Sequence, residues 1–506
     1  MVSYDLIRED RTPVLVGGGQ LTQRDVDPAA SRGPLEMMVE TARRAAADAG
    51  VGPGLLRAVD SVAVVNVLTW EYGNAPRLLA ERIGAHPTEE IYTRFGGDTP
   101  QRLVNETAAK IAAGRVRLAL LAGGEALSTL AKASQARIEL PWVSGGEGSP
   151  TVVGDARPAL SEQEIAHGIE APAHVYPLFE TALRARYGRG VADHVSCLGV
   201  LCSRLSAVAA SNPYAWFRHE RTAAEVATPT SDNRIVGFPY TKYMNAVINV
   251  DQSAALLMAS VAAARALAIP EDRWVYLWAS AEATDRWFLS DRHHYHGSPA
   301  MRAAGGRALA AGGIDIGSVA YFDLYSCFPS ALEIARDMLG IREDDPRALT
   351  VTGGLPYAGG PVNNYTMHAI VTMMEKLRAA PGTLGLITAL GWYMTKHAIG
   401  IYSSAPPARP WHWTEAYDDA IHGTGRVPSL AVEANGRGVV ETCTVVHDRE
   451  GLPKLGIVIG RLDDGRRFIA NTPEDRTAFE ALMVDTAVGQ RGRVAATDGV
   501  NRFSPE

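Results

Sequence analysis

Several side chains that can donate or accept a proton stand close to glycine-rich turns of this chain. Tyr325 and Cys327 follow an apolar run, and His397 lies a few residues past a glycine. A phenol, a thiol or an imidazole placed in this way can act as a general acid or base. Asn363, which follows a turn at residues 359–360, supplies an amide that could hold negative charge developing in a reaction.

A second feature is a helix that begins shortly after two glycines. Thr99 is a favourable N-cap and Pro100 suits the first turn, so the sequence predicts a helix over 100–113. The free N–H groups of a helix N-terminus attract negative charge, which makes this turn a candidate binding site. Gly96 and Gly97 either open space there for a ligand or only permit close packing of the backbone.

The surrounding elements alternate between strand and helix. Short apolar runs in the first 122 residues indicate a parallel α/β sheet covered on both faces. Residues 128–239 break this pattern with Pro-rich and Arg-rich sequence, which is typical of an inserted segment. Alternation returns after residue 251, and the helix–strand–glycine order of 100–124 recurs at 365–391. The recurrence indicates two similar halves.

The sequence changes character after Pro410. Short runs of alternating polarity are separated by turn signals such as Asn435-Gly436 and Asp464-Gly465. These residue pairs favour the tight turns of β-hairpins. Residues 412–506 are therefore predicted to form a small β-barrel, with an OB-like fold as the favoured topology.

Composition restricts the partners. With 46% hydrophobic residues and a formal net charge of −7, the chain is typical of a globular protein without general affinity for nucleic acid. The apolar stretch 254–269 is too short for a membrane span and is predicted to be a buried strand followed by a helix. The N-terminus shows no apolar signal segment, so a cytoplasmic location is expected.

Neither the cysteines nor the histidines form a metal-binding pattern. The four cysteines are Cys197, Cys202, Cys327 and Cys443, and none belongs to a CxxC pair. The cluster His293-His294-Tyr295-His296 has no cysteine or carboxylate at zinc spacing, so it is predicted to lie in a surface loop. We therefore expect neither a metal nor a disulfide framework.

Several glycine-rich motifs follow one another along residues 1–405. They include Ala122-Gly123-Gly124-Glu125-Ala126, Asp323-Leu324-Tyr325-Ser326-Cys327-Phe328 and Gly353-Gly354-Leu355-Pro356-Tyr357-Ala358-Gly359-Gly360-Pro361. The order of these motifs resembles the thiolase superfamily, and specifically its sterol-carrier-protein-type branch. The resemblance implies a duplicated α/β fold of two five-stranded mixed sheets layered with helices, with an inserted loop domain that helps to bind coenzyme A. The expected domains are 1–270 with its insert at 128–239, then 271–405, and an additional barrel at 412–506.

The same resemblance implies that the catalytic residues of the family are missing. The nucleophilic cysteine would fall at Gly97, and the Gly-His-Pro motif reads Gly359-Gly360-Pro361. The second cysteine would fall near Leu390-Gly391, and Tyr325 replaces the histidine of the His-Asp-Cys-Phe segment. The acyl-enzyme route of the family is therefore excluded unless another residue takes over.

The resemblance also implies that the remaining polar groups meet at one end of the sheets. Tyr325 or His397 would move a proton there, while Asn363 and glycine N–H groups hold a thioester oxygen. Cys327 is a further candidate in the same loops. Alternatively, Cys327 is a small buried hydrophobe and His368 is a helix residue with its hydrogen bonds satisfied.

Coenzyme A or an acyl-CoA is the expected ligand, in a groove between the insert and the glycine turns. Arginine and aromatic side chains suit its phosphates and adenine ring, although an exposed arginine is more often only solvated. The candidate binding residues are Gly96, Gly97, Gly359, Gly360, His368, Arg218, Tyr240 and Lys242.

Two functions from different classes fit these residues. The first, which we favour, is an enzyme of the acyltransferase superfamily that makes or breaks a carbon–carbon bond beside an acyl-CoA thioester, in the breakdown of fatty acids or sterols. Without the cysteines this chemistry resembles that of thiolase-like aldolases of sterol side-chain breakdown, which work with an OB-fold partner. The second is a protein that binds acyl-CoA or lipid and has lost catalysis. The sequence leaves both a homodimer and a monomer open.

Overall fold

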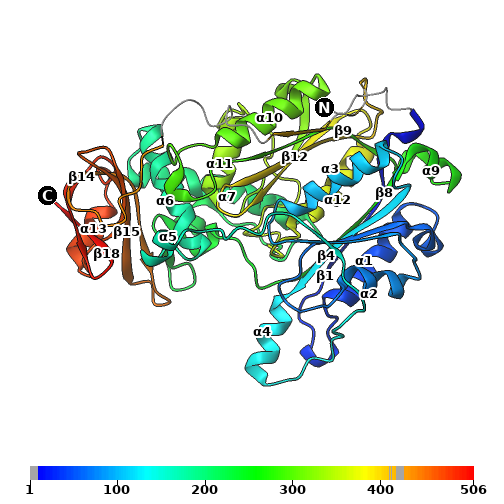
Figure 1. Cartoon of the computed structure of the whole chain (residues 1–506), viewed down its shortest axis with the longest axis horizontal. Coiled ribbons are helices and arrows are strands. Elements are labelled where there is room, and N and C mark those ends of the chain that lie inside the picture. The colour runs from blue at the N-terminus through cyan, green and yellow to red at the C-terminus, as the bar shows by residue number, and fades with distance from the viewer. Residues whose placement is uncertain (1–8, 410, 412, 417–426) are drawn as a thin grey trace.

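The computed structural model describes residues 9–409, 411, 413–416 and 427–506, and most of their strands join one mixed sheet (Figure 1). Its two halves meet where β1 (Pro13–Thr22) and β9 (Val275–Thr284) pair, with Val14 opposite Tyr276 and Leu15 opposite Val275. In order across the sheet the strands are β10 (Val319–Asp323), β11 (Leu384–Gly391), β12 (Lys396–Ser403), β9 (Val275–Thr284), β1 (Pro13–Thr22), β8 (Asp251–Ser260), β4 (Leu118–Ala126), β2 (Ser61–Val64), β3 (Glu89–Thr93) and β5 (Thr151–Val153), with β13 (Trp413–Ala416) paired to β9.

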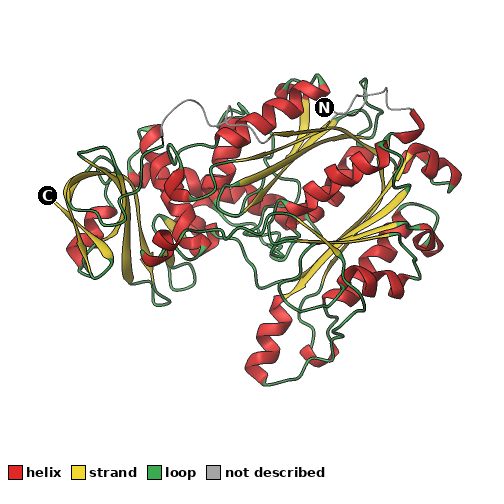
Figure 2. Ribbon diagram, viewed as in Figure 1, coloured by secondary structure: helices red, strands yellow, loops and turns green. Residues whose placement is uncertain are grey.

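Two helices, α3 (Thr99–Ala112) and α12 (Tyr365–Ala379), lie between the halves (Figure 2). The first ten residues of α12 are all buried, as expected of a helix that is covered on every side. Each central helix leads into a strand, α3 into β4 and α12 into β11, so the predicted repeat is present. The prediction of two mixed α/β halves layered with helices is confirmed.

Other helices cover the outer faces of the sheet. Helices α1 (Pro34–Asp48) and α2 (Ala75–Ile83) pack on the first half, and α10 (Pro299–Gly312) and α11 (Pro329–Met338) lie over the second. The apolar stretch 254–269 forms the end of β8 and then α9 (Val261–Ala266), a buried strand and a helix as predicted. The remaining short elements are α4 (Leu127–Ala136) and the 3-10 helices Glu9–Arg11, Pro28–Ala30, Pro53–Ala58, Lys242–Met244, Glu271–Arg273, Leu289–Asp291 and Ile316–Ser318.

The irregular segment that follows α4 carries most of the remaining helices. Among the helices that the structure describes, α7 (Val191–Ser211) is long and apolar enough, by length and composition alone, to cross a membrane. The helices α8 (Ala223–Ala227) and α11 pack against it. A core helix can have the same length and composition. The elements of this insert are α5 (Glu162–Ala166), α6 (Pro172–Tyr187), α7 (Val191–Ser211), α8 (Ala223–Ala227), β6 (Ile235–Gly237) and β7 (Tyr240–Thr241).

The C-terminal strands close into a five-stranded barrel, which confirms the predicted small barrel. Its own core contains Phe468 and Phe503, while Ile457 and Ile469 pack into the core of the insert and the second half. The insert strand β6 also pairs with β14. The strands follow the closed order β14 (Gly436–His447), β15 (Pro453–Leu462), β16 (Arg467–Asn471), β18 (Val500–Pro505) and β17 (Arg491–Thr497), and α13 (Arg476–Leu482) lies between β16 and β17.

Arg467 attaches the barrel to the second half. Its side chain is fully buried, and its Nε donates to Glu441 Oε2 at 2.8 Å. Its Nη1 donates to the backbone oxygens of Ser290, at 2.9 Å, and of Arg292. These bonds satisfy a guanidinium that would otherwise be very costly to bury.

Replacing Arg467 should therefore loosen the barrel. We expect Arg467→Ala to lower the free energy of unfolding by about 3 kcal/mol, because it leaves Glu441 and buried carbonyl groups without their donor. Arg466→Ala, whose side chain is 46% exposed and paired with Asp464, is the control and should change it by about 0.5 kcal/mol or less. Urea unfolding measures both, and equal effects of the two substitutions would contradict this account.

Candidate functional site

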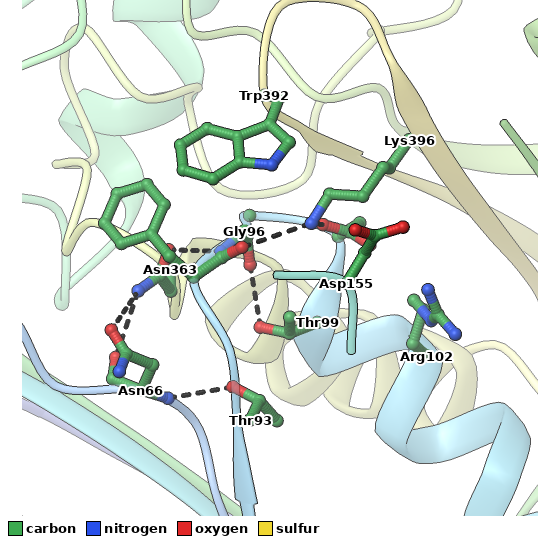
Figure 3. A network of polar contacts seen from close by, with 12 residues as sticks. Asn66, Thr93, Gly96, Thr99, Arg102, Asp155, Asn363, Trp392 and Lys396 are labelled. Carbon is green, nitrogen blue, oxygen red and sulfur yellow. Dashed lines mark hydrogen bonds and ion pairs between the residues drawn. The ribbon is translucent and has the colours of Figure 1, made fainter. Parts of the chain in front are cut away.

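The turn that contains Gly96 and Gly97, here called the glycine turn, lies between β3 and α3, and Figure 3 shows the polar contacts around it. Asn363 Oδ1 accepts from the Gly96 N–H at 2.9 Å, and the Thr99 hydroxyl donates to the Gly96 carbonyl at 2.7 Å. The Asn363 side-chain amide also donates to the backbone oxygen of Asn66 at 3.1 Å. Asn363, predicted as a catalytic residue, therefore ties the glycine turn to Asn66 through the two ends of its amide.

The space that a side chain at residue 97 would need is already filled. A Cβ built on Gly97 would collide with the hydroxyl of Tyr325 and would lie 2.6 Å from the carbonyl oxygen of Leu390. Tyr325 thus places its phenol at the N-terminal end of α3, where the family resemblance puts the nucleophile. Its ring packs edge-on against Tyr365, with 5.5 Å between the ring centres.

A carboxylate fills the corresponding space at Gly391. A Cβ on Gly391 would collide with Asp98 Oδ1 and would lie 2.6 Å from Lys396 Cε. Asp98 is fully buried and forms an ion pair with Lys396, 3.1 Å from Oδ1 to Nζ. Lys396 Nζ also donates to the Phe95 carbonyl at 3.1 Å. The two places where the resemblance puts cysteine side chains therefore hold the Tyr325 hydroxyl and the Asp98 carboxylate.

Aromatic rings and strained backbone border this ion pair. Trp392 stacks on Phe95, with 5.0 Å between ring centres, and Lys396 Nζ lies 5.5 Å from the Trp392 ring. Trp392, Met394 and Val362 have positive φ angles of 54°, 60° and 46°, which non-glycine residues rarely adopt. Strain of this kind persists where the surroundings impose it, and it often marks functional loops.

A small cavity of about 10 Å³ adjoins the ion pair, close to the size of one water site. Asp98 Oδ2 has no hydrogen-bond partner among the described residues. Figure 3 shows Asp155 beside Lys396, between it and Arg102. The cavity is lined by Thr93, Arg94, Asp98, Thr99, Arg102, Leu103, Glu106, Val153, Gly154 and Lys396.

Burial sets the protonation of the two nearby candidates. It raises the pKa of the Tyr325 phenol well above its usual value of 10, with smaller contributions from Cys327 and Asp98. Burial also raises the pKa of Cys327 to about 12, so this thiol is not an available thiolate. Tyr325 therefore remains a neutral phenol that can donate a hydrogen bond.

The two predicted histidines have partners elsewhere. His397 follows Lys396 on β12, and successive strand residues point to opposite faces, so its ring turns away from Asp98 to Ser298 Oγ at 3.1 Å. His368 Nδ1 lies 2.9 Å from Gln20 Oε1. Burial lowers the pKa of His397 to about 4 and that of His368 to about 3, so both rings are neutral at pH 7.

The residues predicted to bind coenzyme A do not all gather in one place. Tyr240 is fully buried, and its hydroxyl donates to Glu180 at 2.6 Å. Arg218 and Lys242 are exposed. Gly359 lies against the amide of Gln252, and Gly360 lies near the Val247 carbonyl, at 3.4 Å from where a Cβ would be.

Sequence reasoning missed Asp98 and Lys396. Asp98 directly follows Gly96 and Gly97, and Lys396 directly precedes His397. Each is therefore a sequence neighbour of a residue that was predicted to belong to the site. Strand alternation could have placed Lys396 on the face opposite His397. The pairing itself joins residues almost 300 positions apart, and no local pattern signals it.

The model of the thiolase-like protein type 1 additional C-terminal domain matches residues 423–499 of the chain. The chain is also similar, at 36% identity and a TM-score of 0.85, to a monomeric SCP2-thiolase-like protein type 1 from Mycobacterium smegmatis, with 98% of this chain and 99% of that one covered. No curated protein matches the chain.

Two more distant structures share the fold alone. The Ltp2-ChsH2(DUF35) aldolase is 18% identical with a TM-score of 0.58, covering 78% of this chain and 98% of that one. An acetyl-CoA acetyltransferase from Syntrophomonas wolfei is 16% identical with a TM-score of 0.56, covering 78% and 99%.

Restoring a cysteine at residue 97 should not restore a thiolase. We expect Gly97→Cys to lower the free energy of unfolding by about 1–3 kcal/mol, because the new side chain meets Tyr325 and the Leu390 carbonyl. Gly306→Cys is the control, since a Cβ there meets nothing within 4 Å. Thermal unfolding and acetoacetyl-CoA thiolysis are measured together. A stable Gly97→Cys variant with fast, iodoacetamide-sensitive thiolysis would show that the site has room for the nucleophile.

The buried histidines should make the protein less stable in mild acid. Unfolded histidines have a pKa near 6.5, whereas His397 and His368 have folded pKa values of about 4 and about 3. The unfolded chain therefore takes up protons first, so stability that is complete above pH 6.5 is lost as the pH falls towards 4 and then 3. Each histidine contributes a slope of about 1.4 kcal/mol per pH unit in its window.

Urea unfolding at several pH values between 7.5 and 5 tests this slope. His368→Gln should reduce it by the contribution of one proton, whatever its effect on stability at pH 7.5. An unchanged slope in this variant would mean that His368 is protonated in the folded protein.

Proposed function

Because this chain belongs to the SCP2-thiolase-like proteins of type 1, we propose that it acts on acyl-CoA thioesters by carbon–carbon bond chemistry that needs no cysteine. Two polar side chains occupy the space that side chains at residues 97 and 391 would need, and this occupation supports the proposal most strongly. The Tyr325 hydroxyl and the Asp98 carboxylate occupy the places of side chains at residues 97 and 391. They supply an acid and a base where the family resemblance puts two thiols.

A retro-aldol cleavage of a 3-hydroxyacyl-CoA uses these two groups directly. Asp98 would take the proton of the 3-hydroxyl group while the bond between carbons 2 and 3 breaks. Carbon 3 then becomes a ketone or aldehyde, and the electron pair of the broken bond forms a thioester enolate. Tyr325 would donate a hydrogen bond to the enolate oxygen. The proton held by Asp98 moves to carbon 2, which releases a shortened acyl-CoA.

The neighbouring residues would keep these groups in position. Lys396 holds the Asp98 carboxylate, and Asn363 fixes the turn that carries it. Asp98 is fully buried, so we propose that the stack of Trp392 on Phe95 opens when the acyl chain enters. Closure afterwards excludes water from the enolate.

The aldolase with the shared fold supports the direction of this proposal by analogy alone. Coenzyme A enters as part of the substrate, and the exposed Arg218 and Lys242 are proposed contacts for its phosphates.

We further propose that the chain works as a monomer in the cytoplasm, and that its domains are 1–270, 271–405 and 412–506.

The close packing around Asp98 and residue 97 also favours a second function, which is binding without catalysis. The absence of exposure at Asp98, together with the filled space at residue 97, also suits a protein that binds acyl-CoA or lipid without converting it. The two proposals differ in turnover and agree in binding.

Cleavage of 3-hydroxyacyl-CoA thioesters of several chain lengths tests the first proposal. We expect release of a carbonyl product without added thiol, and no loss of rate after iodoacetamide treatment. Asp98→Asn and Tyr325→Phe should each lower kcat/KM by about 100-fold or more, because each removes a proton-transferring or charge-holding group. Tyr321→Phe, a matched change on β10, should leave the rate within about twofold.

Calorimetry on the same variants separates the two functions. Acyl-CoA binding without turnover in the folded wild-type protein would support the binding function and reject the enzyme. Turnover that survives Asp98→Asn would instead show that the base is another residue.

A further inference from the structure

Three buried titratable side chains from three helices meet away from the glycine turn. Glu180 on α6, His194 on α7 and Glu333 on α11 place ligand-capable atoms within 4.8 Å of one another. Their side chains are almost fully buried, with exposures of 0%, 0% and 2%. We call these residues the Glu–His–Glu cluster.

One carboxylate oxygen of this cluster has no partner among the described residues. His194 Nε2 lies 2.6 Å from Glu180 Oε1, and the Tyr240 hydroxyl donates to Glu180 Oε2 at 2.6 Å. Glu333 Oε2, by contrast, finds no hydrogen bond among the described residues. His194 Nδ1 is also unpartnered there, but it points away from Nε2, so an ion bound to Nε2 would not contact it. Unpartnered polar atoms on side chains this deeply buried are rare and call for a missing ligand or proton.

The two carboxylates of the cluster also lack a directly paired lysine or arginine among the described residues. Arg336 is near enough to influence both Glu180 and Glu333, and Arg189 is near enough to influence Glu180, but these arginines pair with Asp337, at 2.8 Å, and with Glu343. The side chains of Glu180 and Glu333 are themselves within hydrogen-bond reach of each other. Two carboxylates in contact inside a protein cannot both stay ionised without a cation, so a metal ion or a shared proton must offset them.

We propose that the Glu–His–Glu cluster binds one divalent transition-metal ion of the Zn²⁺ type. An imidazole and two carboxylates form a suitable donor set for such an ion. The Tyr240 hydroxyl on Glu180 supplies the outer hydrogen bond that commonly orients a ligating carboxylate. Donor atoms of a tetrahedral zinc site lie about 3.3 Å apart, so His194 and Glu180 need to separate by less than about 1 Å.

This ion would have a structural role. It would tie the insert helices α6 and α7 to α11 of the second half, on a different set of residues from Asp98 and Tyr325. The sequence contains no motif for it, because the three ligands come from separate helices without metal-ligand spacing. The proposal does not depend on the proposed reaction.

Zinc titration of the whole chain tests the site. After dialysis against a chelator, calorimetry with ZnCl₂ should show one site per chain, and zinc should raise Tm. Glu333→Gln should weaken zinc binding by about 100-fold or more, since an amide is a poor substitute for a carboxylate ligand. Glu162→Gln, at an exposed position of α5, is the matched control and should bind zinc like the wild type.

The alternative is a shared proton between Glu180 and Glu333. In that case zinc and the chelator leave Tm unchanged, and Glu333→Gln keeps wild-type stability because an amide can donate as the protonated acid does. That outcome overturns the metal site. If Glu333→Gln does not fold, Co²⁺ added to the wild-type chain decides, because a bound ion gives visible absorption bands and their absence rejects the proposal.

Discussion

The ion pair between Asp98 and Lys396 connects the two halves of the protein at their centre. Asp98 stands at the start of α3 in the first half, and Lys396 begins β12 in the second. Both side chains are almost fully buried, with exposures of 1% and 5%. Permanent removal of either partner would leave the other charge buried alone, which strongly destabilises a protein. The Asp98 and Lys396 side chains therefore limit the space that is left for side chains on the backbone segments packed around them.

The ion pair accounts for the glycines at residues 96 and 391. A Cβ at either position would collide with Asp98, and one at residue 96 would also collide with Lys396. Tyr325 imposes the same restriction at Gly97. At the two positions where the resemblance to thiolases puts cysteine side chains, the space itself is therefore taken by a carboxylate and a phenol. We therefore expect that a single substitution to cysteine does not produce thiolase chemistry.

The fold could be predicted from the sequence far better than the site. Apolar strands, the repeated helix–strand order and the glycine motifs are local features that specify local structure, and the two α/β halves and the barrel followed from them. Whether a polar side chain meets its neighbours depends instead on contacts between distant segments. Tyr325 was predicted as a site residue because it lies in a motif that resembles one of the thiolases. His397 and Lys396 are adjacent in the sequence, and they differ in which face of β12 they occupy.

The contacts between the barrel and the rest of the chain were likewise not predictable from the sequence. Hairpin signals predicted the barrel, but the buried bonds of Arg467 to residues 290 and 292 lie in no motif. These long-range contacts set which groups are buried, and burial in turn sets the protonation of Tyr325 and Cys327. The chemistry proposed for the chain is therefore a property of its packing as much as of its residue types.

Exchange of the protons on carbon 2 of acetyl-CoA with D₂O tests the central claim most directly, because it reports a base that acts beside a thioester. Followed by proton NMR, the wild-type chain should catalyse this exchange before and after iodoacetamide treatment, and Asp98→Asn should abolish it. An absence of exchange in the folded wild-type chain, or its loss on alkylation, would contradict the replacement of the two thiols by Asp98 and Tyr325.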